Sequence, residues 1–193
     1  MTLSLSFLRD TFASLTTTTR LVALIVDPFS IDGVNVAKKF GVLQYLFFPS
    51  LAMSLQFFFH LPKLDEMVTC EYRDLLELIK LPGSVPVHGR DLTDSVQGRS
   101  NDAYKGFLAN IKQFVSVEGI ILNSFMELKD DTIKDLWVEK PGKPPIYPIG
   151  LLIQTGSSDA SKERSKCLQW LDDQPSGSVV FVSFESGGTL SHD

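Results

Sequence analysis

The chain has 193 residues and a mass of 21.5 kDa, and its 44% hydrophobic residues are enough to fill the core of one large domain, or of one domain and part of another. Its net charge of −5 and isoelectric point near 5.2 argue against a nucleic-acid-binding protein, because such proteins gather lysine and arginine to neutralise phosphates. No basic run is present in the sequence.

The cysteines and the N-terminal sequence indicate a cytoplasmic protein. Cys70 and Cys167 are far apart and form no metal-binding spacing, which favours free thiols in a reducing compartment over a disulfide. The N-terminal residues show no basic region followed by a long apolar core, since Arg9 and Asp10 interrupt it, so no secretory signal is predicted. Residues 43–62 are rich in apolar side chains, but proline and polar residues break the run, and no membrane span is expected.

The first half of the chain alternates short apolar runs with helical patterns. Residues 21–27 (LVALIVD) are typical of a short strand, and residues 31–41 place apolar side chains at helical spacing. Residues 42–48 (VLQYLFF) predict the next strand, which a turn at Pro49 ends. A helical region is expected to follow and to end at the Pro82-Gly83 breaker.

The second half continues this alternation. Residues 119–124 (GIILNS) predict a buried strand, and residues 130–137 a further helix. Before them, residues 101–117 predict a helix with one apolar face, made of Tyr104, Phe107, Leu108, Ile111, Phe114 and Val115. Alternating strands and helices predict an α/β fold with a largely parallel sheet.

A domain boundary is predicted where the composition changes, at residues 139–166. Prolines, then glycine and serine, then charged residues are typical of an extended linker. We expect a first domain over residues 1–153, and over residues 154–193 the linker and the start of a second domain, in which a helix resumes near Cys167. Residues 179–184 (VVFVSF) predict the first strand of that second domain.

These segments resemble a known enzyme family. Residues 21–42, 48–66 and 167–191 are similar to plant family 1 UDP-glycosyltransferases, in particular to the branch that glucosylates hydroquinone and related phenols. The resemblance covers nearly the whole chain and implies the GT-B fold, in which two Rossmann-like domains face each other across a cleft. The N-terminal domain of the family holds the acceptor and the C-terminal domain holds the nucleotide sugar. The resemblance also implies that this chain is truncated at both ends.

The resemblance implies a catalytic role for Asp27. The family transfers glucose from UDP-glucose, a co-substrate, to an acceptor hydroxyl with inversion, and it needs neither a metal nor a resident cofactor. A histidine is the general base, and an aspartate that matches Asp27 orients and charges it. Without the resemblance, an aspartate at a strand end would be interpreted as a helix cap. His60, His88 and His192 match no family motif, so the chain alone is expected to be inactive.

The same resemblance implies where both substrates bind. Pro28, Phe29 and Phe58 match an aromatic acceptor pocket suited to flat phenols, although neighbouring phenylalanines also suit an ordinary core. The turn of Ser186, Gly187, Gly188 and Thr189 matches the loop that contacts the donor diphosphate. Glu185 departs from the glycine usual there, and its carboxylate would repel a phosphate.

Two functional hypotheses follow. The first is a fragment of a UDP-glucose-dependent phenol glucosyltransferase. The alternative is a noncatalytic relative of the same ancestry that binds small phenols or a protein partner. An enzyme of the first kind would bind a small phenol and a UDP-sugar, and not nucleic acid.

Overall fold

The computed structural model describes residues 2–125, 131–138, 141–150, 152 and 166–180. The chain divides into two compact units, Met1–Leu152 and Ile153–Asp193, and each is treated by itself.

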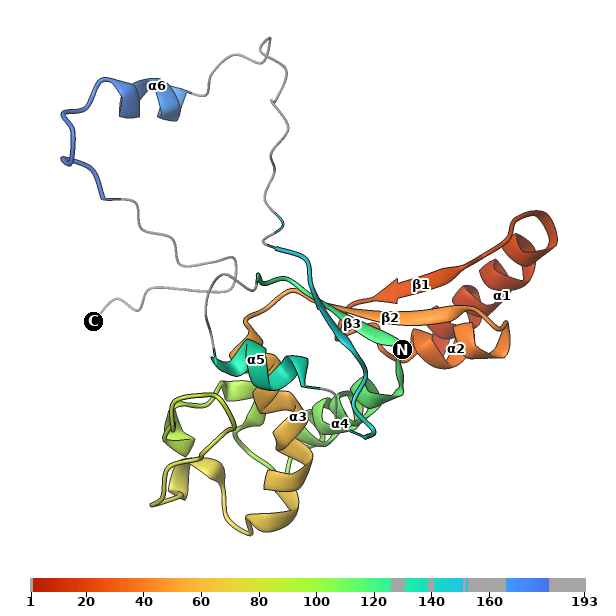
Figure 1. Ribbon diagram of the computed structural model, residues 1–193, viewed down its shortest axis with the longest axis horizontal. Coiled ribbons are helices and arrows are strands. Elements are labelled where there is room, and N and C mark those ends of the chain that lie inside the picture. Colours follow the sequence, from red (N-terminus) through yellow and green to blue (C-terminus); the bar gives the residue numbers. More distant parts are fainter. Residues whose placement is uncertain (1, 126–130, 139–140, 151, 153–165, 181–193) are drawn as a thin grey trace. The chain divides into compact units, whose positions relative to one another are not determined.

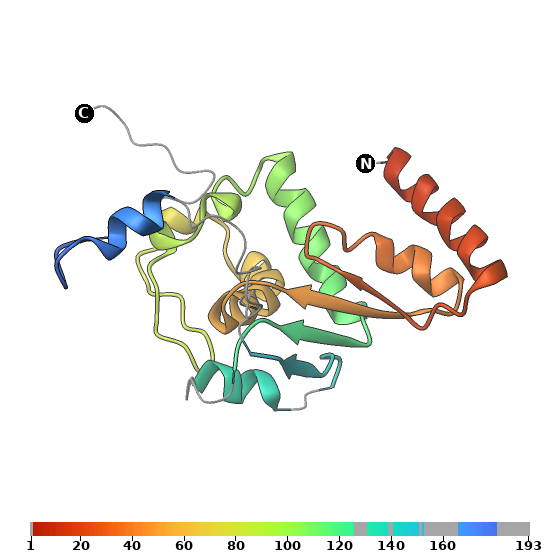
Figure 2. The same cartoon turned by 90° about the horizontal axis from the view of Figure 1, so that it is seen from above.

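The first unit is built on a four-stranded parallel sheet in the order β1-β2-β3-β4 (Figure 1). The strands are β1 (Ala23–Val26), β2 (Leu43–Phe48), β3 (Gly119–Leu122) and β4 (Ile146–Pro148). In Figure 2 the arrowheads of β2, β3 and β4 point the same way, so the carboxyl ends of these strands meet at one edge of the sheet. The predicted α/β fold with a parallel sheet is confirmed.

One helix precedes β1, and the others lie in the connections between the strands. They are α1 (Thr2–Thr18), α2 (Gly33–Lys39), α3 (Ala52–Met67), α4 (Asp102–Lys112) and α5 (Asp131–Trp137), with short 3₁₀ turns at Tyr72–Asp74, Gly89–Asp91, Asp94–Val96 and Gln113–Ser116. Asn101 caps α4, because its side-chain oxygen accepts the backbone N–H of Tyr104 at 2.7 Å. Figure 1 shows the helices of this unit on one side of the sheet.

The core therefore lies on one face of the sheet. Leu46, Phe48 and Ile120 point to this face and are fully buried among side chains of the helices. Alternate residues point to the other face, where Ile25, at 58% exposure, and Leu43, at 47%, stand in solvent. No described helix of this unit covers this second face.

The prediction for the region after Pro49 is correct for its first half only. Helix α3 ends at Met67, and the chain does not remain helical up to Pro82. Val68 is extended, and Tyr72 turns inward to lie fully buried against Tyr104, which a continuous helix would not allow. Tertiary packing has overridden the local helical preference here.

Two further differences concern the ends of this unit. Helix α1 was not predicted; its Phe12 packs on Phe40 with ring centroids 5.6 Å apart. The predicted linker begins too early, because β4 lies inside its proline-rich part. Pro148 has no N–H to donate, and it is tolerated because β4 is an edge strand of the described sheet. The next residue, Ile149, donates its N–H to the carbonyl of Leu122 at 3.1 Å.

In the second unit the structure describes only residues 166–180. They include helix α6 (Lys166–Asp172), which agrees with the helix expected near Cys167. Most of the strand predicted over residues 179–184 lies outside the described residues, and Val179 and Val180 are not in a strand.

The one-sided core predicts very different effects for two leucine truncations. Leu122 is fully buried, whereas Leu76 is 99% exposed. Leu122→Ala should lower the free energy of unfolding by about 2 to 5 kcal/mol, through lost burial and the cavity left behind. Leu76→Ala should change it by less than about 0.5 kcal/mol. Urea unfolding of both variants measures the difference, and equal losses would contradict the burial of Leu122.

Candidate functional site

Asp27 directly follows strand β1 and holds a tight turn. Its Oδ1 accepts the backbone N–H of Phe29 at 3.0 Å and that of Ser30 at 2.8 Å. Among the described residues, the other carboxylate oxygen has no hydrogen-bond partner, and the side chain is exposed. The turn therefore presents a fixed carboxylate oxygen at the carboxyl edge of the sheet.

An open cavity of about 590 Å³ lies beside this turn. We call it the Asp27 cavity; Leu5, Phe7 and Leu8 of α1 line it, together with residues of β1, Phe29, Ser30, Asp32 and Gly33. Phe29 is 79% exposed and is free to contact a ligand, whereas Pro28 is half-buried and does not line the cavity.

Phe58 lies elsewhere, in a cluster of aromatic rings on α3. Its ring meets Phe107 edge-on at a centroid distance of 5.3 Å, Phe48 at 5.7 Å and Phe114 at 6.3 Å. These contacts hold the half-buried ring in one orientation. Phe58 thus packs against the core, and it also borders a cavity, so its predicted contact with an acceptor stays a prediction.

This second, mostly apolar cavity has a volume of about 170 Å³, and we call it the Phe58 cavity. One side is formed by α3, through Met53, Ser54, Phe57 and Phe58. The opposite side comes from the irregular segment between α3 and α4, through Leu81, Val87, Asp91, Leu92 and Thr93. The structure thus places Phe58 in a different cavity from Asp27 and Phe29. The lining from the irregular segment was not predicted, because it carries no periodic pattern.

The histidines do not pair with Asp27 in the described part of the chain. His60 lies on α3, and burial, then the neighbouring charge of Lys63, lowers its pKa. His88 precedes the turn Gly89–Asp91, and no hydrogen bond links either ring to Asp27 among the residues described. His192 and the predicted donor-binding residues Ser186, Gly187, Gly188 and Thr189 lie outside the described residues.

Neither a metal site nor a membrane span is found among the described residues. They contain no group of three or more histidine, cysteine, aspartate or glutamate side chains that could hold a metal ion. None of their helices is long and apolar enough to cross a membrane.

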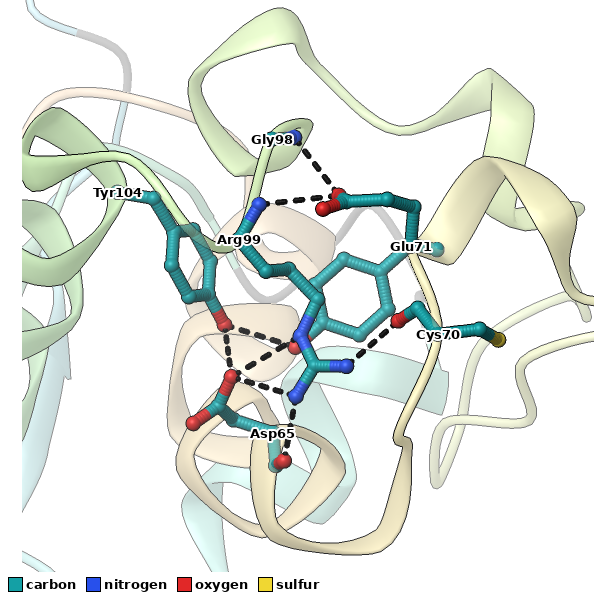
Figure 3. A network of polar contacts seen from close by, with 7 residues as sticks. Asp65, Cys70, Glu71, Gly98, Arg99 and Tyr104 are labelled. Atoms are coloured by element: carbon teal, nitrogen blue, oxygen red, sulfur yellow. Dashed lines mark hydrogen bonds and ion pairs between the residues drawn. The ribbon is translucent and has the colours of Figure 1, made fainter.

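A polar network lies beside the irregular segment and ties it to α3 and α4 (Figure 3). Arg99 donates to Asp65 Oδ1 from Nη2 at 3.0 Å and from Nε at 3.2 Å, and Tyr104 donates to the same oxygen at 2.5 Å. The Tyr72 and Tyr104 hydroxyls are 2.8 Å apart, and the Arg99 guanidinium lies 4.9 Å from the Tyr72 ring centroid. Together with Glu71, these residues form what we call the Arg99 clamp.

The clamp shifts the pKa values of its members. Burial works to raise the pKa of Asp65, but hydrogen bonds from Tyr104 and Arg99 and the positive charge of Arg99 leave it below its usual value. Burial, and then the hydrogen bond to Asp65, raise the pKa of Tyr104. Burial also raises the pKa of Tyr72. At neutral pH Asp65 is therefore an ionised carboxylate, and Tyr72 and Tyr104 are neutral phenols.

Comparison with known proteins identifies relatives along the whole chain. No protein-family model matches it. Hydroquinone glucosyltransferase of Rauvolfia serpentina is 51% identical over 193 residues, which are 100% of this chain and 41% of that enzyme. UDP-glycosyltransferase 72B1 of Arabidopsis thaliana is 50% identical over 188 residues, 95% of this chain and 39% of that enzyme. This chain is homologous to the plant UDP-glycosyltransferases.

Solved structures of such enzymes share the fold. A UDP-glucosyltransferase from Polygonum tinctorium, in complex with 3,4-dichloroaniline, matches with a TM-score of 0.91 and 50% identity over 97% of this chain and 42% of its own. Phytolacca americana UGT2, complexed with UDP-2-fluoro-glucose and pterostilbene, gives a TM-score of 0.88 with 49% identity over 97% and 41%. The predicted resemblance to plant UDP-glycosyltransferases and the predicted GT-B-type fold are confirmed. The chain spans about 40% of the length of these relatives.

The turn at Asp27 predicts that removing the charge of Asp27 and removing its hydrogen bonds have different effects on the free energy of unfolding. Asp27→Asn keeps the Oδ1 acceptor and should leave the free energy of unfolding within about 0.5 kcal/mol of the original, whereas Asp27→Ala should lose about 1 kcal/mol, as when a capping side chain is removed. Chemical unfolding of both variants tests this. Equal stabilities for Asn and Ala would mean that the two amide bonds do not matter.

The lowered pKa of Asp65 predicts that part of the free energy of unfolding is lost at acid pH. Because its folded-state pKa lies below the unfolded value near 3.9, its contribution is full above that pH and is lost as the pH falls through the folded pKa. Asp65→Asn should therefore destabilise the protein at pH 7, by about 1 to 3 kcal/mol for hydrogen bonds to a charged group, and the difference should shrink below about pH 4. Urea unfolding between pH 3 and 7 measures it; a gap that stays constant would contradict the ionised clamp.

Proposed function

We propose that this chain is part of a UDP-glucose-dependent glycosyltransferase that transfers glucose to a phenolic hydroxyl with inversion. The first unit is its acceptor-binding part, and residues 154–193 hold a linker and the start of the UDP-sugar-binding domain. Relatives at about 50% identity support this, since their names include hydroquinone glucosyltransferase and a UDP-glucosyltransferase capable of glucosylating indoxyl.

The observation that carries the proposal is the position of Asp27. Open α/β sheets bind ligands at the carboxyl ends of their strands, and there a turn fixes one oxygen of Asp27 and leaves the other exposed. Such an oxygen can accept the N–H of an imidazole, which fixes the tautomer and raises the basicity of the opposite ring nitrogen. Since neither His60 nor His88 is bonded to Asp27, the histidine belongs to another part of the full-length enzyme in this proposal.

The reaction then follows from proton balance. The imidazole takes the proton of the phenolic hydroxyl while the phenolic oxygen forms a bond to the anomeric carbon of glucose. The bond from that carbon to the diphosphate breaks on the opposite side, and UDP leaves with the electron pair. Asp27 stabilises the imidazolium that forms. Because these 193 residues span 41% of the hydroquinone glucosyltransferase, we expect them to be inactive alone.

The substrates divide between the two units. Phe29, beside the Asp27 cavity, and Phe58, in the Phe58 cavity, would contact different parts of the acceptor, with Pro28 shaping the turn. The turn of Ser186, Gly187, Gly188 and Thr189 would contact the diphosphate of UDP-glucose, which is consumed as a co-substrate. The proposal includes a cytoplasmic location and neither a metal nor a resident cofactor. A noncatalytic binding role has no support from the relatives described, each of which is named as a transferase.

Asp27→Asn in the full-length enzyme tests the proposal. The variant should lower kcat with UDP-glucose and hydroquinone by about 10²- to 10⁴-fold, the usual contribution of acid–base assistance, without weakening UDP binding. The acid limb of the pH–rate profile should move to lower pH, because the base loses a carboxylate that raises its pKa. Proton NMR of the product should show the β-glucoside.

Asp10→Asn serves as the matched control, since Asp10 is exposed on α1 and pairs only loosely with Arg9 at 3.4 Å. It should retain full activity. An Asp27→Asn enzyme with unchanged kcat and an unchanged pH profile would refute the role given to Asp27. Absence of glucosyl transfer by the unmodified full-length protein to any phenol would refute the function itself.

A further inference from the structure

The irregular segment between α3 and α4, residues 68–101, forms one wall of the Phe58 cavity; we call it the wall segment. Its regular structure consists of three short 3₁₀ turns and one antiparallel bridge, in which Ile79 and Val87 exchange backbone hydrogen bonds of 2.8 and 3.0 Å. A segment this long with so little regular structure in a compact domain usually serves binding.

The wall segment gives the cavity the size of one aromatic ring. Leu81, Val87 and Leu92 face the phenylalanines of α3 across a space of about 170 Å³. An enclosed apolar cavity of roughly 150 Å³ is known to hold benzene, so this space, which is open to solvent on one side, has room for a single six-membered ring. The position of the wall segment therefore decides which acceptors enter.

The Arg99 clamp joins the two ends of the wall segment to each other. Glu71 Oε2 accepts the backbone N–H groups of Gly98 and Arg99, each at 2.9 Å. In return, Arg99 donates from Nη1 to the carbonyl of Cys70 at 2.6 Å, and from Nη2 to the carbonyl of Asp65 at 2.7 Å. Figure 3 shows Arg99, near one end of the segment, bonded to Asp65 at the end of α3 and to Cys70 and Glu71 at the other end of the segment.

A second anchor holds the middle of the wall segment. Thr132 on α5 donates its hydroxyl to the carbonyl of Gly83 at 2.7 Å and lies 3.0 Å from the hydroxyl of Ser84. The cavity-lining Leu81 and Val87 flank this anchor, and Leu92 lies between it and the clamp. The lining side chains are thus held between two fixed points.

A contribution to stability does not by itself explain why the clamp is built on a partly buried ion pair. The Arg99 and Asp65 side chains are only 15% and 26% exposed, and an ion pair this far removed from water contributes little net stability compared with apolar packing. A fully bonded polar network does, however, specify one arrangement of the backbone around it. The clamp has the properties expected of a device that sets geometry.

We propose that Arg99 is a positioning residue: through the clamp it fixes the wall segment at the distance from α3 that makes the Phe58 cavity a site for one phenolic ring. A larger acceptor must then place its second ring outside this cavity. The inference rests on the proposed function, because it concerns the acceptor of that reaction.

The test compares Arg99→Lys with Arg73→Lys in the full-length protein. Arg73 lies in the same segment and is exposed, so the control makes the same substitution without touching the clamp. Lysine keeps the charge of Arg99 but cannot make its forked set of bonds. Tyr72→Phe is a milder second variant that removes only the hydroxyl next to Tyr104.

Arg99→Lys should raise the Kd for hydroquinone, measured by calorimetry without donor, by about tenfold if the wall segment is in place a tenth of the time. The KM for hydroquinone should rise with it, while the KM for UDP-glucose and the kcat at saturating acceptor stay unchanged. The ratio of kcat/KM for hydroquinone to kcat/KM for pterostilbene should fall. The backbone amide hydrogens of Ile79 and Val87 should exchange faster with solvent. Tyr72→Phe should act in the same direction but less.

A clamp that only stabilises the fold would lower Tm without changing hydroquinone affinity or acceptor preference, and that result in Arg99→Lys would overturn the proposal. If Arg99→Lys does not fold, Tyr72→Phe decides in the same way. The binding arm separates this inference from the proposed function. If Arg99→Lys weakens the binding of hydroquinone but the unmodified protein does not glucosylate any phenol, the proposed function is refuted and the role of the clamp is retained. If the protein glucosylates hydroquinone but Arg99→Lys leaves its binding unchanged, the role of the clamp is refuted and the proposed function is retained.

Discussion

The order of the four parallel strands is the constraint on which the first unit depends. Crossovers between parallel strands are almost always right-handed, so strands that follow one another in sequence place their connecting helices on the same face. That face holds the core around Leu46 and Phe48. The opposite face, with Ile25, Leu43 and Tyr147 exposed, has the composition of an interior, and parallel sheets are normally covered on both faces.

The same order gathers the chemistry at one edge of the sheet. The carboxyl ends of β1, β2 and β3 are followed by Asp27, Pro49 and Asn123. Asn123 stiffens this edge, because its side chain donates to the carbonyl of Pro49 at 3.2 Å and accepts the N–H of Leu152 at 2.8 Å. Side chains at such an edge are held by the sheet while remaining accessible, which suits Asp27 as a fixed charge.

The sequence predicts this fold well where burial imposes a pattern. Continuous apolar runs revealed β1, β2 and β3, and helical spacing revealed α2 and α4. Prediction failed where distant contacts decide: Tyr72 leaves the helical pattern because Tyr104 offers it a buried partner. The Arg99 clamp could not be predicted, since Asp65 and Arg99 are 34 positions apart and share no motif. Resemblance pointed to Asp27, but the separation of its cavity from that of Phe58 is visible only in three dimensions.

The two sides of the Phe58 cavity differ in how far they can adapt. On the α3 side, the ring of Phe58 is fixed by Phe48, Phe107 and Phe114, and a shift there would disturb the core itself. The wall segment has few regular backbone bonds, so its position depends on discrete side-chain contacts at its ends and middle. Under the role proposed for the clamp, changes in the cavity-lining residues of the wall segment would alter the fit of the acceptor without altering the sheet.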